Sequence, residues 1–371
     1  MTVFYIISSR QKYNTGKGGS YFSSASIAKT LSERHEVYFF VVGDQNSPVI
    51  EEMLHKRHFH LKMGGINNLL SIMKYVWMTI KLKPDVIHIY DLVVIFFGYI
   101  SQILSGSKIV MTQPGGANRT ISSGYFPKNI ITCSEENYDF FVKLKACEFV
   151  ENIPNRIIPF QTNYSLLGFL KRRINFTPDD LIIIKLGRMH DYYSLGIDQA
   201  YDFYINLKNK TNKAKLIYLG HQDENYILPA KFVVDPNVYL INDAILTKDA
   251  KSVIGFADYL IANGRGAMEG FHTGNKVLVP TKKHGLIVVN RNNLNNVIKY
   301  NFSERILLEE NQLPININQS EPNEFYRNVF DKYFNVLTGA KQIELFYSKA
   351  IKDYPKPMNM LKAFGSLFIN F

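Results

Sequence analysis

Short apolar runs alternate with amphipathic segments along the first part of the chain. The runs predict buried β-strands, because they are continuous and bounded by turn-forming residues. They lie at Val3–Ser8, Glu36–Val42, Val86–Tyr90, Ile109–Thr112 and Ile130–Cys133. Helical spacing falls between them, at Tyr21–Arg34 and at Met73–Lys83, where Pro84 ends the pattern,. Strands that alternate with helices in this way form a parallel sheet covered on both faces.

A second alternation of the same kind begins at Leu181. Its predicted strands are Leu181–Leu186, Lys215–Leu219, Val238–Ile241, Tyr259–Ala262, Lys276–Pro280 and Leu286–Val289,. Prolines interrupt the pattern between Val150 and Asp180, which indicates a connection between domains,. The fold class that follows is α/β, with two Rossmann-like, doubly wound domains facing a cleft. We expect an N-terminal domain over residues 1–160, a C-terminal domain over 161–345, and a helical tail over 346–371 that could cross back to the first domain.

Length and composition agree with two domains. A chain of 371 residues exceeds what one core usually supports, and a hydrophobic fraction of 46% is ample for two cores,. The formal net charge of +11 favours contact with phosphates or anionic lipid, although a solvated basic surface gives the same charge,. No basic motif with interleaved aromatic residues indicates a nucleic-acid module. We therefore expect phosphorylated substrates or a membrane surface as partners, and no nucleic acid.

Three features bear on the compartment. Only Cys133 and Cys147 occur, without a CxxC pair, which is typical of a reducing cytoplasm and argues against a zinc site,. The first residues lead into a strand and lack the apolar core of a signal peptide,. The longest apolar run, Leu92–Leu104, is too short to span a bilayer and predicts a buried helix,. The expected location is the cytoplasm, with any membrane contact peripheral and on the inner face.

The segment from Phe256 to Pro280 contains the strongest candidate chemistry. It predicts a strand, a tight loop at Asn263–Gly266, a helix from Ala267 and a second strand. Glycines let the loop approach a ligand, and the start of the helix presents N–H groups to an anion such as phosphate. Arg265 could add a cation to this site, and Glu269 could cap the helix or accept hydrogen bonds from a sugar hydroxyl. The alternative is a plain strand-loop-helix connection whose glycines serve only the turn.

Loops of the first domain should line one rim of its sheet. A glycine loop at Thr15–Ser20 follows the first strand, and other loops start at Tyr90, Gln113 and Cys133. Ligands of such sheets collect at the carboxyl ends of the strands. Asp91 therefore lies where a base for an acceptor would be needed, although a turn or helix-cap aspartate has the same position. Ser134 predicts a helix N-cap, and His88 inside VIHIY predicts a packed histidine,.

Six segments in order resemble one family. They are KGGSYFSSASIAKTLSERHEVYFF, PDVIHIYD, IITCSEEN, NIPNRIIPF, IIIKLGR and ADYLIANGRGAMEGFHTGNKVLVP. Together they resemble the GT-B-fold glycosyltransferases of the bacterial type that includes sucrose synthase and the lipopolysaccharide and capsule sugar transferases. The resemblance implies transfer of a hexose or N-acetylhexosamine from a UDP- or GDP-linked sugar to a glycan or lipid-linked acceptor, in cell-surface polysaccharide synthesis. It implies no cofactor and no metal, and the chain has no Asp-x-Asp metal signature.

The resemblance also implies roles for individual residues. Arg188 is similar to the family's residue that neutralises the donor diphosphate, and Glu269 to the carboxylate that binds the donor ribose. These two are the catalytic candidates. The expected donor site comprises Gly18, Gly19, Gly187, Arg188, His190, Asn263, Gly264, Arg265, Gly266, Ala267 and Glu269. The expected acceptor site comprises Asp91, Gln113, Gly115 and Gly116.

Two departures from the family pattern leave alternatives open. Ile261 stands where the family usually has a second glutamate, and the segment after Arg188 lacks the usual lysine. His190, Asp191 or Arg265 could then contact phosphate or sugar instead. One alternative is a GT-B-fold epimerase that acts on the nucleotide sugar, and another is a non-catalytic glycan-binding relic. A nicotinamide-dependent oxidoreductase would need an acidic residue where Lys282, Lys283 and His284 occur,.

Overall fold

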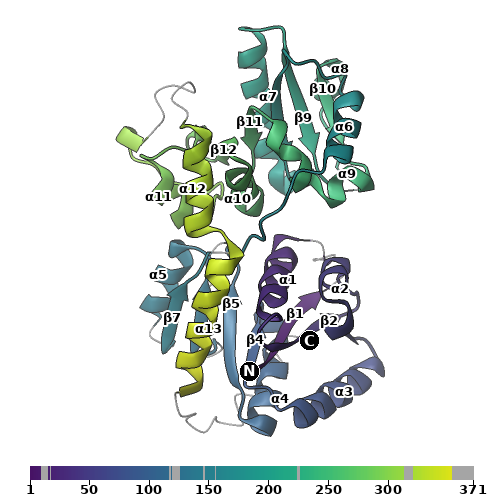
Figure 1. Cartoon of the computed structure of the whole chain (residues 1–371), viewed down its shortest axis with the longest axis vertical. Coiled ribbons are helices and arrows are strands. Elements are labelled where there is room, and N and C mark those ends of the chain that lie inside the picture. Colours follow the sequence, from purple (N-terminus) through teal and green to yellow (C-terminus); the bar gives the residue numbers. More distant parts are fainter. Residues whose placement is uncertain are drawn as a thin grey trace. The chain divides into compact units, whose positions relative to one another are not determined.

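The computed structural model describes residues 1–9, 16, 18–116, 118, 126–144, 147–154, 156–223, 226–312 and 321–352. It divides into two compact units (Figure 1). Unit 1 contains Met1–Ile158 together with the chain from Asn335 onward, and unit 2 contains Pro159–Phe334. The return to unit 1 thus begins at Asn335, whereas the expected tail begins at residue 346. Helical spacing occurs at Glu321–Leu337 and at Lys341–Asp353. The apolar periodicity of these two segments does not reveal which core each one joins.

Unit 1 is built on a sheet of seven strands in the order β3-β2-β1-β4-β5-β6-β7. All neighbouring pairs are parallel. The strands are β1 (Thr2–Ser9), β2 (Glu36–Gly43), β3 (His58–Lys62), β4 (Val86–Ile89), β5 (Lys108–Gln113), β6 (Asn129–Thr132) and β7 (Phe149–Asn152).

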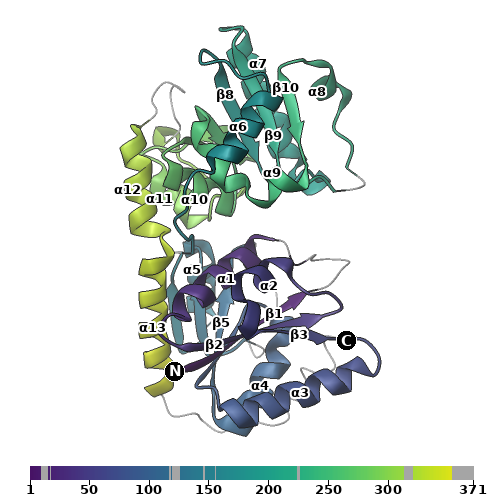
Figure 2. The same cartoon turned by 45° about the vertical axis from the view of Figure 1, so that its right-hand side comes forward.

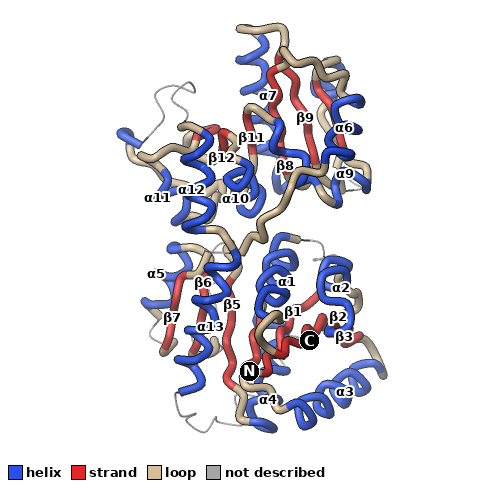
Figure 3. The backbone as a smooth tube through the Cα atoms, viewed as in Figure 1, coloured by secondary structure: helices blue, strands red, loops and turns tan. Residues whose placement is uncertain are grey.

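Helices cover both faces of this sheet (Figure 3). They are α1 (Gly19–Leu31), α2 (Pro48–Leu54), α3 (Asn67–Leu82), α4 (Ile95–Ser105), α5 (Glu135–Lys143) and α13 (Val336–Lys352), with short 3-10 turns at His55–Arg57 and Leu92–Val94. Because side chains alternate along β1, Val3 and Tyr5 pack with α1, α2 and α13, while Phe4 and Ile6 pack with α3, α4 and α5,. Ser134 caps α5 by accepting the N–H of Asn137, as predicted.

A buried polar network attaches α13 to the sheet of unit 1. The Tyr347 hydroxyl of α13 lies 2.9 Å from the Tyr5 hydroxyl and hydrogen-bonds His88 Nδ1, while His88 Nε2 lies 2.6 Å from Thr112 Oγ1. Burial lowers the pKa of His88 to about 3, so the ring is neutral. His88 is therefore a packed histidine, in agreement with the prediction.

Unit 2 has a six-stranded sheet in the order β10-β9-β8-β11-β12-β13. Only β13 runs antiparallel to its neighbour. The strands are β8 (Leu181–Leu186), β9 (Ala214–Leu219), β10 (Val238–Ile241), β11 (Tyr259–Ile261), β12 (Lys276–Thr281) and β13 (Gly285–Val288). The helices are α6 (Tyr164–Arg173), α7 (Ser194–Lys208), α8 (Ala230–Val234), α9 (Ala244–Lys248), α10 (Gly264–Thr273), α11 (Leu294–Lys299) and α12 (Asn323–Tyr333), with 3-10 turns at Asp191–Tyr193, Ala250–Phe256 and Glu310–Gln312.

The sequence predicted the central strands but missed the strands β3 and β7 and the helices α2, α6, α8 and α9. The strands β3 and β7 are the two edges of their sheet. Edge strands face solvent and tolerate polar residues, so HFHLK and FVEN do not form an apolar run,. The helix α6 lies within the segment interpreted as a connection, where the surrounding prolines obscured its pattern.

Candidate functional site

Both sheets have a switch point, where the strand order reverses. In unit 1 it lies between β1 and β4, and in unit 2 between β8 and β11. Helices that follow the two strands of such a pair cover opposite faces, which leaves a crevice for ligands beyond the carboxyl ends. In unit 2 the loops after β8 and β11 carry most of the predicted donor residues. The sheet topology therefore brings Arg188 and Asn263 to the same rim.

The helix α10 differs from its prediction. It begins at Gly264 rather than at Ala267, so the expected loop is the first turn of the helix and Glu269 lies in the second turn. The N–H of Gly264 is donated to the carbonyl of Phe302, at 3.1 Å, and that of Gly266 to the carbonyl of Asn263. Two N–H groups that were expected to donate hydrogen bonds to a phosphate therefore donate to protein carbonyls instead. The low helix propensity of glycine caused the error, because tertiary packing overrides it here.

Glycines in α10 serve packing against the sheet. A Cβ on Gly266 would lie 3.2 Å from side-chain atoms of both Leu186 and Ala262, and one on Gly270 would lie 2.3 Å from Leu260 Cδ2. The helix can approach β8 and β11 this closely only without side chains at these positions. Gly266 therefore faces the sheet. Gly264 has φ +50°, and a Cβ there would meet only the Asn301 carbonyl, at 4.0 Å, so it remains the glycine at the rim.

Arg265 and Glu269 form an ion pair within α10. The guanidinium Nε lies 2.9 Å from Glu269 Oε1, and both side chains are nearly buried, at 12% and 11% exposed. Their spacing of four residues places them on one face of the helix. The pair fixes the Glu269 carboxylate and largely cancels the charge of Arg265, whereas the sequence suggested separate roles for them. The second oxygen of Glu269 is not part of this contact.

The loop after β8 presents Arg188 and His190. Arg188 is half-buried and lies near Tyr193, whose pKa is raised by burial while the positive Arg188 opposes that rise. His190 Nδ1 accepts the N–H of Tyr192 at 2.9 Å, so its proton is on Nε2, which faces Asp223 Oδ2 at 3.6 Å. Gly187 bridges the strand and this loop with φ +142°. These contacts hold the loop in place beside Arg188.

Lys185 is a residue that the sequence reasoning missed. It is the second-last residue of β8 and is 6% exposed, with no hydrogen bond or ion pair to any described residue. A Cβ on Gly196, at the start of α7, would lie 3.4 Å from its Nζ, and one on Gly187 would lie 4.0 Å away. Burial lowers the pKa of Lys185 to about 8, against the opposing effect of nearby Glu304. The signal was a single lysine within the apolar run IIIKL, three residues before Arg188.

Asp91 occupies the switch point of unit 1. It follows β4, and its Oδ2 accepts the N–H of Ser8 at the end of β1, at 2.8 Å. Its Oδ1 is buried and has no hydrogen-bond partner among the described residues. Burial raises the pKa of this carboxyl, against the effect of the N–H groups of Ser8, Val93 and Val94. The geometry thus combines the cap position with a buried, poorly paired oxygen.

A pocket of about 100 Å³ opens beside Asp91. Gln113 and Gly115 line it, and the Gln113 amide donates to the Gly115 carbonyl at 3.0 Å. Its other walls are mostly apolar and include Leu92, Met111, Phe126, Phe140 and Phe141. Gly116 does not line this pocket, and its carbonyl accepts a hydrogen bond from the side-chain amide of Asn137. Three of the four predicted acceptor residues therefore line one pocket.

The predicted glycine loop after β1 is described only in part. Gly18 is the N-cap of α1 and Gly19 its first residue. Gly16 accepts a hydrogen bond from Ser47 Oγ at 2.7 Å. Residues 10–15 and 17 lie outside the described residues. The structure thus places Gly18 and Gly19 at the start of a helix on the same rim as Asp91.

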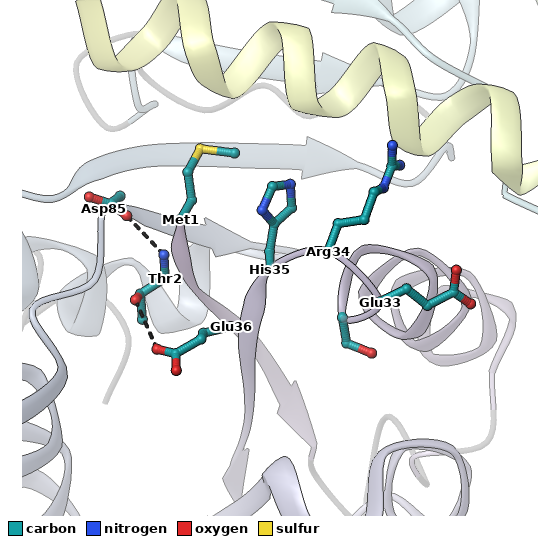
Figure 4. Close-up of a pocket in the computed structure, with 8 residues that line it drawn as sticks. Met1, Thr2, Glu33, Arg34, His35, Glu36 and Asp85 are labelled. Atoms are coloured by element: carbon teal, nitrogen blue, oxygen red, sulfur yellow. Dashed lines mark hydrogen bonds between the residues drawn. The ribbon is translucent and has the colours of Figure 1, made fainter.

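A second pocket of unit 1 lies at the amino ends of its strands, opposite the rim that carries Asp91 (Figure 4). It has a volume of about 480 Å³ and is lined at the amino ends of β1 and β2 by residues such as Met1, Arg34 and Glu36. Thr2 N–H donates to Asp85 Oδ2 at 2.8 Å there, and Arg34 pairs with Glu344 of α13 at 3.1 Å. Glu36 also accepts a hydrogen bond from Thr2 Oγ1, at 3.3 Å. The pocket lies at the amino ends of its strands, away from the rim where ligands of such sheets bind,. We therefore assign no site to it.

Among the described residues, no group of three His, Cys, Asp or Glu side chains could hold a metal ion. In the same part of the chain, no helix is long and apolar enough to cross a bilayer.

Two doubly wound units in one chain define the GT-B class of fold, and solved structures of similar fold include glycosyltransferases of that class. HepE from Anabaena, solved in complex with UDP-glucose, has a TM-score of 0.62 at 14% identity, over 94% of this chain and 100% of that chain. Sucrose-phosphate synthase from Thermosynechococcus elongatus has a TM-score of 0.58 at 13% identity, over 94% and 99%.

A third similar structure has another activity. A protein assigned as UDP-N-acetylglucosamine 2-epimerase, from Listeria monocytogenes, has a TM-score of 0.54 at 11% identity, over 97% of this chain and 98% of that chain. Neither a protein-family model nor a curated protein matches the sequence. The comparisons therefore identify the GT-B fold.

Proposed function

We propose that this protein is a glycosyltransferase. It moves a hexose or N-acetylhexosamine from a UDP- or GDP-linked sugar to a glycan or lipid-linked acceptor in cell-surface polysaccharide synthesis. The donor binds to unit 2 and the acceptor to unit 1. A cytoplasmic location with peripheral membrane contact fits a lipid-linked acceptor.

The observation that carries this proposal is the charge at the switch point of unit 2. The buried Lys185 lies at the end of β8 and Arg188 in the loop just after it, where a ligand of a doubly wound sheet binds,. A buried lysine with no hydrogen bond or ion pair among the described residues is costly, and an anionic ligand would remove most of that cost. A nucleoside diphosphate has the required charge. Lys185 also supplies, from the strand, a cation that the family usually supplies from the segment after Arg188.

The chemical step follows from these charges. The acceptor hydroxyl oxygen forms a bond to the anomeric carbon, the bond from that carbon to the diphosphate oxygen breaks, and the diphosphate leaves with the electron pair. Arg188 and Lys185 stabilise the negative charge that develops on it. Because side-chain cations do this, we propose that transfer requires no metal ion and no cofactor. An excess of EDTA should then leave the rate unchanged.

Asp91 is the proposed acceptor of the hydroxyl proton. Its buried oxygen has no partner among the described residues and borders the pocket with Gln113 and Gly115. A carboxyl whose pKa is raised is a better base toward a hydroxyl group than an ordinary one,. The apolar walls of the pocket suit the flat face of a sugar ring or the beginning of a lipid chain.

Thermal unfolding with nucleoside diphosphates tests donor binding. At a concentration about 100 times the dissociation constant, UDP or GDP should stabilise the protein by about 2.7 kcal/mol. No stabilisation by either would contradict the proposal. A panel of radiolabelled nucleotide sugars with membrane extracts then tests transfer, which releases nucleoside diphosphate as label enters the extract.

The same panel separates the alternatives. An epimerase, favoured by the similarity to the Listeria protein, would convert the sugar without releasing diphosphate. A non-catalytic glycan-binding relic would bind glycan and leave every nucleotide sugar of the panel unchanged. Release of diphosphate with labelled product excludes both.

A further inference from the structure

The helix α3 carries an apolar stripe on its outer face. Ile66, which precedes its first turn, and five residues of the helix are between 54% and 77% exposed: Leu69, Leu70, Met73, Trp77 and Ile80. Their spacing of three or four residues places them on one face. The opposite face is buried in unit 1 through Ser71, Tyr75, Met78 and Thr79. No other described helix of this protein exposes more than three large apolar side chains.

The stripe is longer than ordinary surface exposure explains. Single exposed apolar residues are common, but a continuous row over a whole helix indicates a binding face. In Figure 2, α3 lies beside α4 along one border of unit 1, with no described element over its outer face.

The charge around the stripe identifies the partner. Residues 53–84 contain no Asp or Glu and contain Lys56, Arg57, Lys62, Lys74, Lys81 and Lys83. Lys74 and Lys81 are exposed on α3 and lie over aromatic rings, with Lys81 Nζ 4.8 Å from the centre of Trp77 and Lys74 Nζ 5.3 Å from that of Phe59. An apolar row flanked by lysine, with a tryptophan within it, is the pattern of a helix that lies in the interface of a bilayer.

We propose that α3 docks unit 1 on the surface of a membrane that contains anionic lipid. The apolar row enters the boundary between headgroups and acyl chains, and the lysine ammonium groups extend from beside it to the lipid phosphates. A second copy of this chain is a poorer partner, because a symmetric contact would bring the same cations together. This proposal deepens the proposed function by naming the surface that brings the enzyme to a lipid-linked acceptor.

Trp77 allows a direct test, because it is the only tryptophan of the chain. The full chain is mixed with vesicles of phosphatidylcholine alone or with about a third of phosphatidylglycerol, and flotation measures the bound fraction. On the anionic vesicles the Trp77 emission should shift to shorter wavelength, and lipids brominated on their acyl chains should quench it. Emission that does not change while the protein floats with the vesicles would overturn the proposal.

Matched variants locate the contact. Leu70→Glu with Met73→Glu should weaken vesicle binding at least about 30-fold, because two apolar side chains are lost from the interface. The control is Ile245→Glu with Leu345→Glu, which changes two similarly exposed residues outside this face and should leave binding unchanged. Lys74→Ala with Lys81→Ala should weaken binding to anionic vesicles on the order of tenfold and have little effect on neutral ones.

Other outcomes identify other occupants. A blue shift of Trp77 without vesicles, together with a mass that rises with concentration, would show self-association and overturn the proposal. Vesicle binding that persists in Leu70→Glu/Met73→Glu, but is lost when residues 353–371 are deleted, would assign the contact to the C-terminal segment instead. Circular dichroism confirms that the variants fold. None of these measurements depends on sugar transfer, so failure of α3 to bind leaves the transferase proposal intact, and the reverse also holds.

Discussion

The two switch points have the same topology and opposite chemistry. In unit 2 the rim carries Arg188 and the buried Lys185, while in unit 1 it carries the buried carboxyl of Asp91 beside an apolar pocket. Both groups lie at the carboxyl end of one strand of the pair where the order reverses, β8 in unit 2 and β4 in unit 1,. One rim is suited to an anion and the other to a neutral hydroxyl compound that gives up a proton.

The difference shows how one scaffold supports two roles. A parallel sheet determines where a ligand can bind, whereas the side chains at the strand ends determine which ligand does. If the charged side chains determine which ligand each rim binds, removal of one charge should impair the function of that rim alone. Each rim can therefore be tested by a single substitution.

Asp91→Asn should remove the proposed base of unit 1. Asparagine keeps the shape and can still accept the N–H of Ser8, so folding should be retained. We expect kcat to fall by about 100-fold to 10,000-fold, with the affinity for UDP or GDP unchanged. In the wild type, the carboxylate is lost as the pH falls through its raised pKa, so kcat should decline on the acid side at a higher pH than for an ordinary aspartate. Steady-state kinetics across pH measures the loss of kcat in the variant and the acid decline in the wild type. An unaltered kcat would show that Asp91 serves only as the N-cap of the turn at Leu92–Val94.

Arg188→Met should weaken the donor rim. Hydrogen bonds between charged groups are worth about 1.5–3 kcal/mol, so the dissociation constant for UDP or GDP should rise about 10-fold to 100-fold. Calorimetric titration measures it, with Arg291→Met as the control, because Arg291 is an exposed arginine of the same unit. Uridine or guanosine, which lack phosphate, should bind wild type and variant equally. An equal loss for the nucleosides would contradict a phosphate contact.

The comparison also shows what a sequence can reveal. Both rims were predictable, because alternating strands and helices fix the order of elements, and loops after strands meet at one edge. Asp91, Gln113 and Gly115 were predicted together and line one pocket. The central strands were predicted within a residue or two, because burial on both faces makes them continuously apolar.

What the sequence could not reveal depends on tertiary contacts. Gly266 and Gly270 lie inside α10 because Leu186 and Leu260 occupy the space of their side chains, which a local pattern does not show. Arg265 and Glu269 were considered separately, although four residues on a helix bring them together,. Lys185 was overlooked because a lysine in a strand is ordinarily exposed, and its burial depends on α7 covering that face.

Lys185→Met should have opposite effects on binding and on stability. The variant should bind UDP or GDP about tenfold more weakly, since one of the two cations proposed to contact the diphosphate is lost. It should also be more stable by about 2 kcal/mol at pH 7, because a charge buried at a pKa of about 8 opposes folding at any pH below that value,. Wild-type affinity should fall as the pH rises above about 8, where Lys185 loses its proton, and the variant should lack this decline. Reduced stability with unchanged binding would indicate a merely structural lysine.

His88 provides the matching case in unit 1, a buried ionisable group whose two ring nitrogens already have protein partners, Tyr347 and Thr112. Its folded pKa of about 3 lies below the ordinary 6.5, so between these values only the unfolded chain binds the proton. Stability is therefore full above pH 6.5 and falls as the pH is lowered toward 3. Between pH 7 and 5.5 the loss should be about 1 kcal/mol. Urea unfolding followed through Trp77, which lies in unit 1, measures it against His88→Gln, and nucleotide affinity should not change. If both proteins lost stability equally on acidification, His88 would not be the group responsible. The contrast between His88, whose hydrogen bonds are complete within the protein, and Lys185, which is proposed to pair with a ligand, would then not hold.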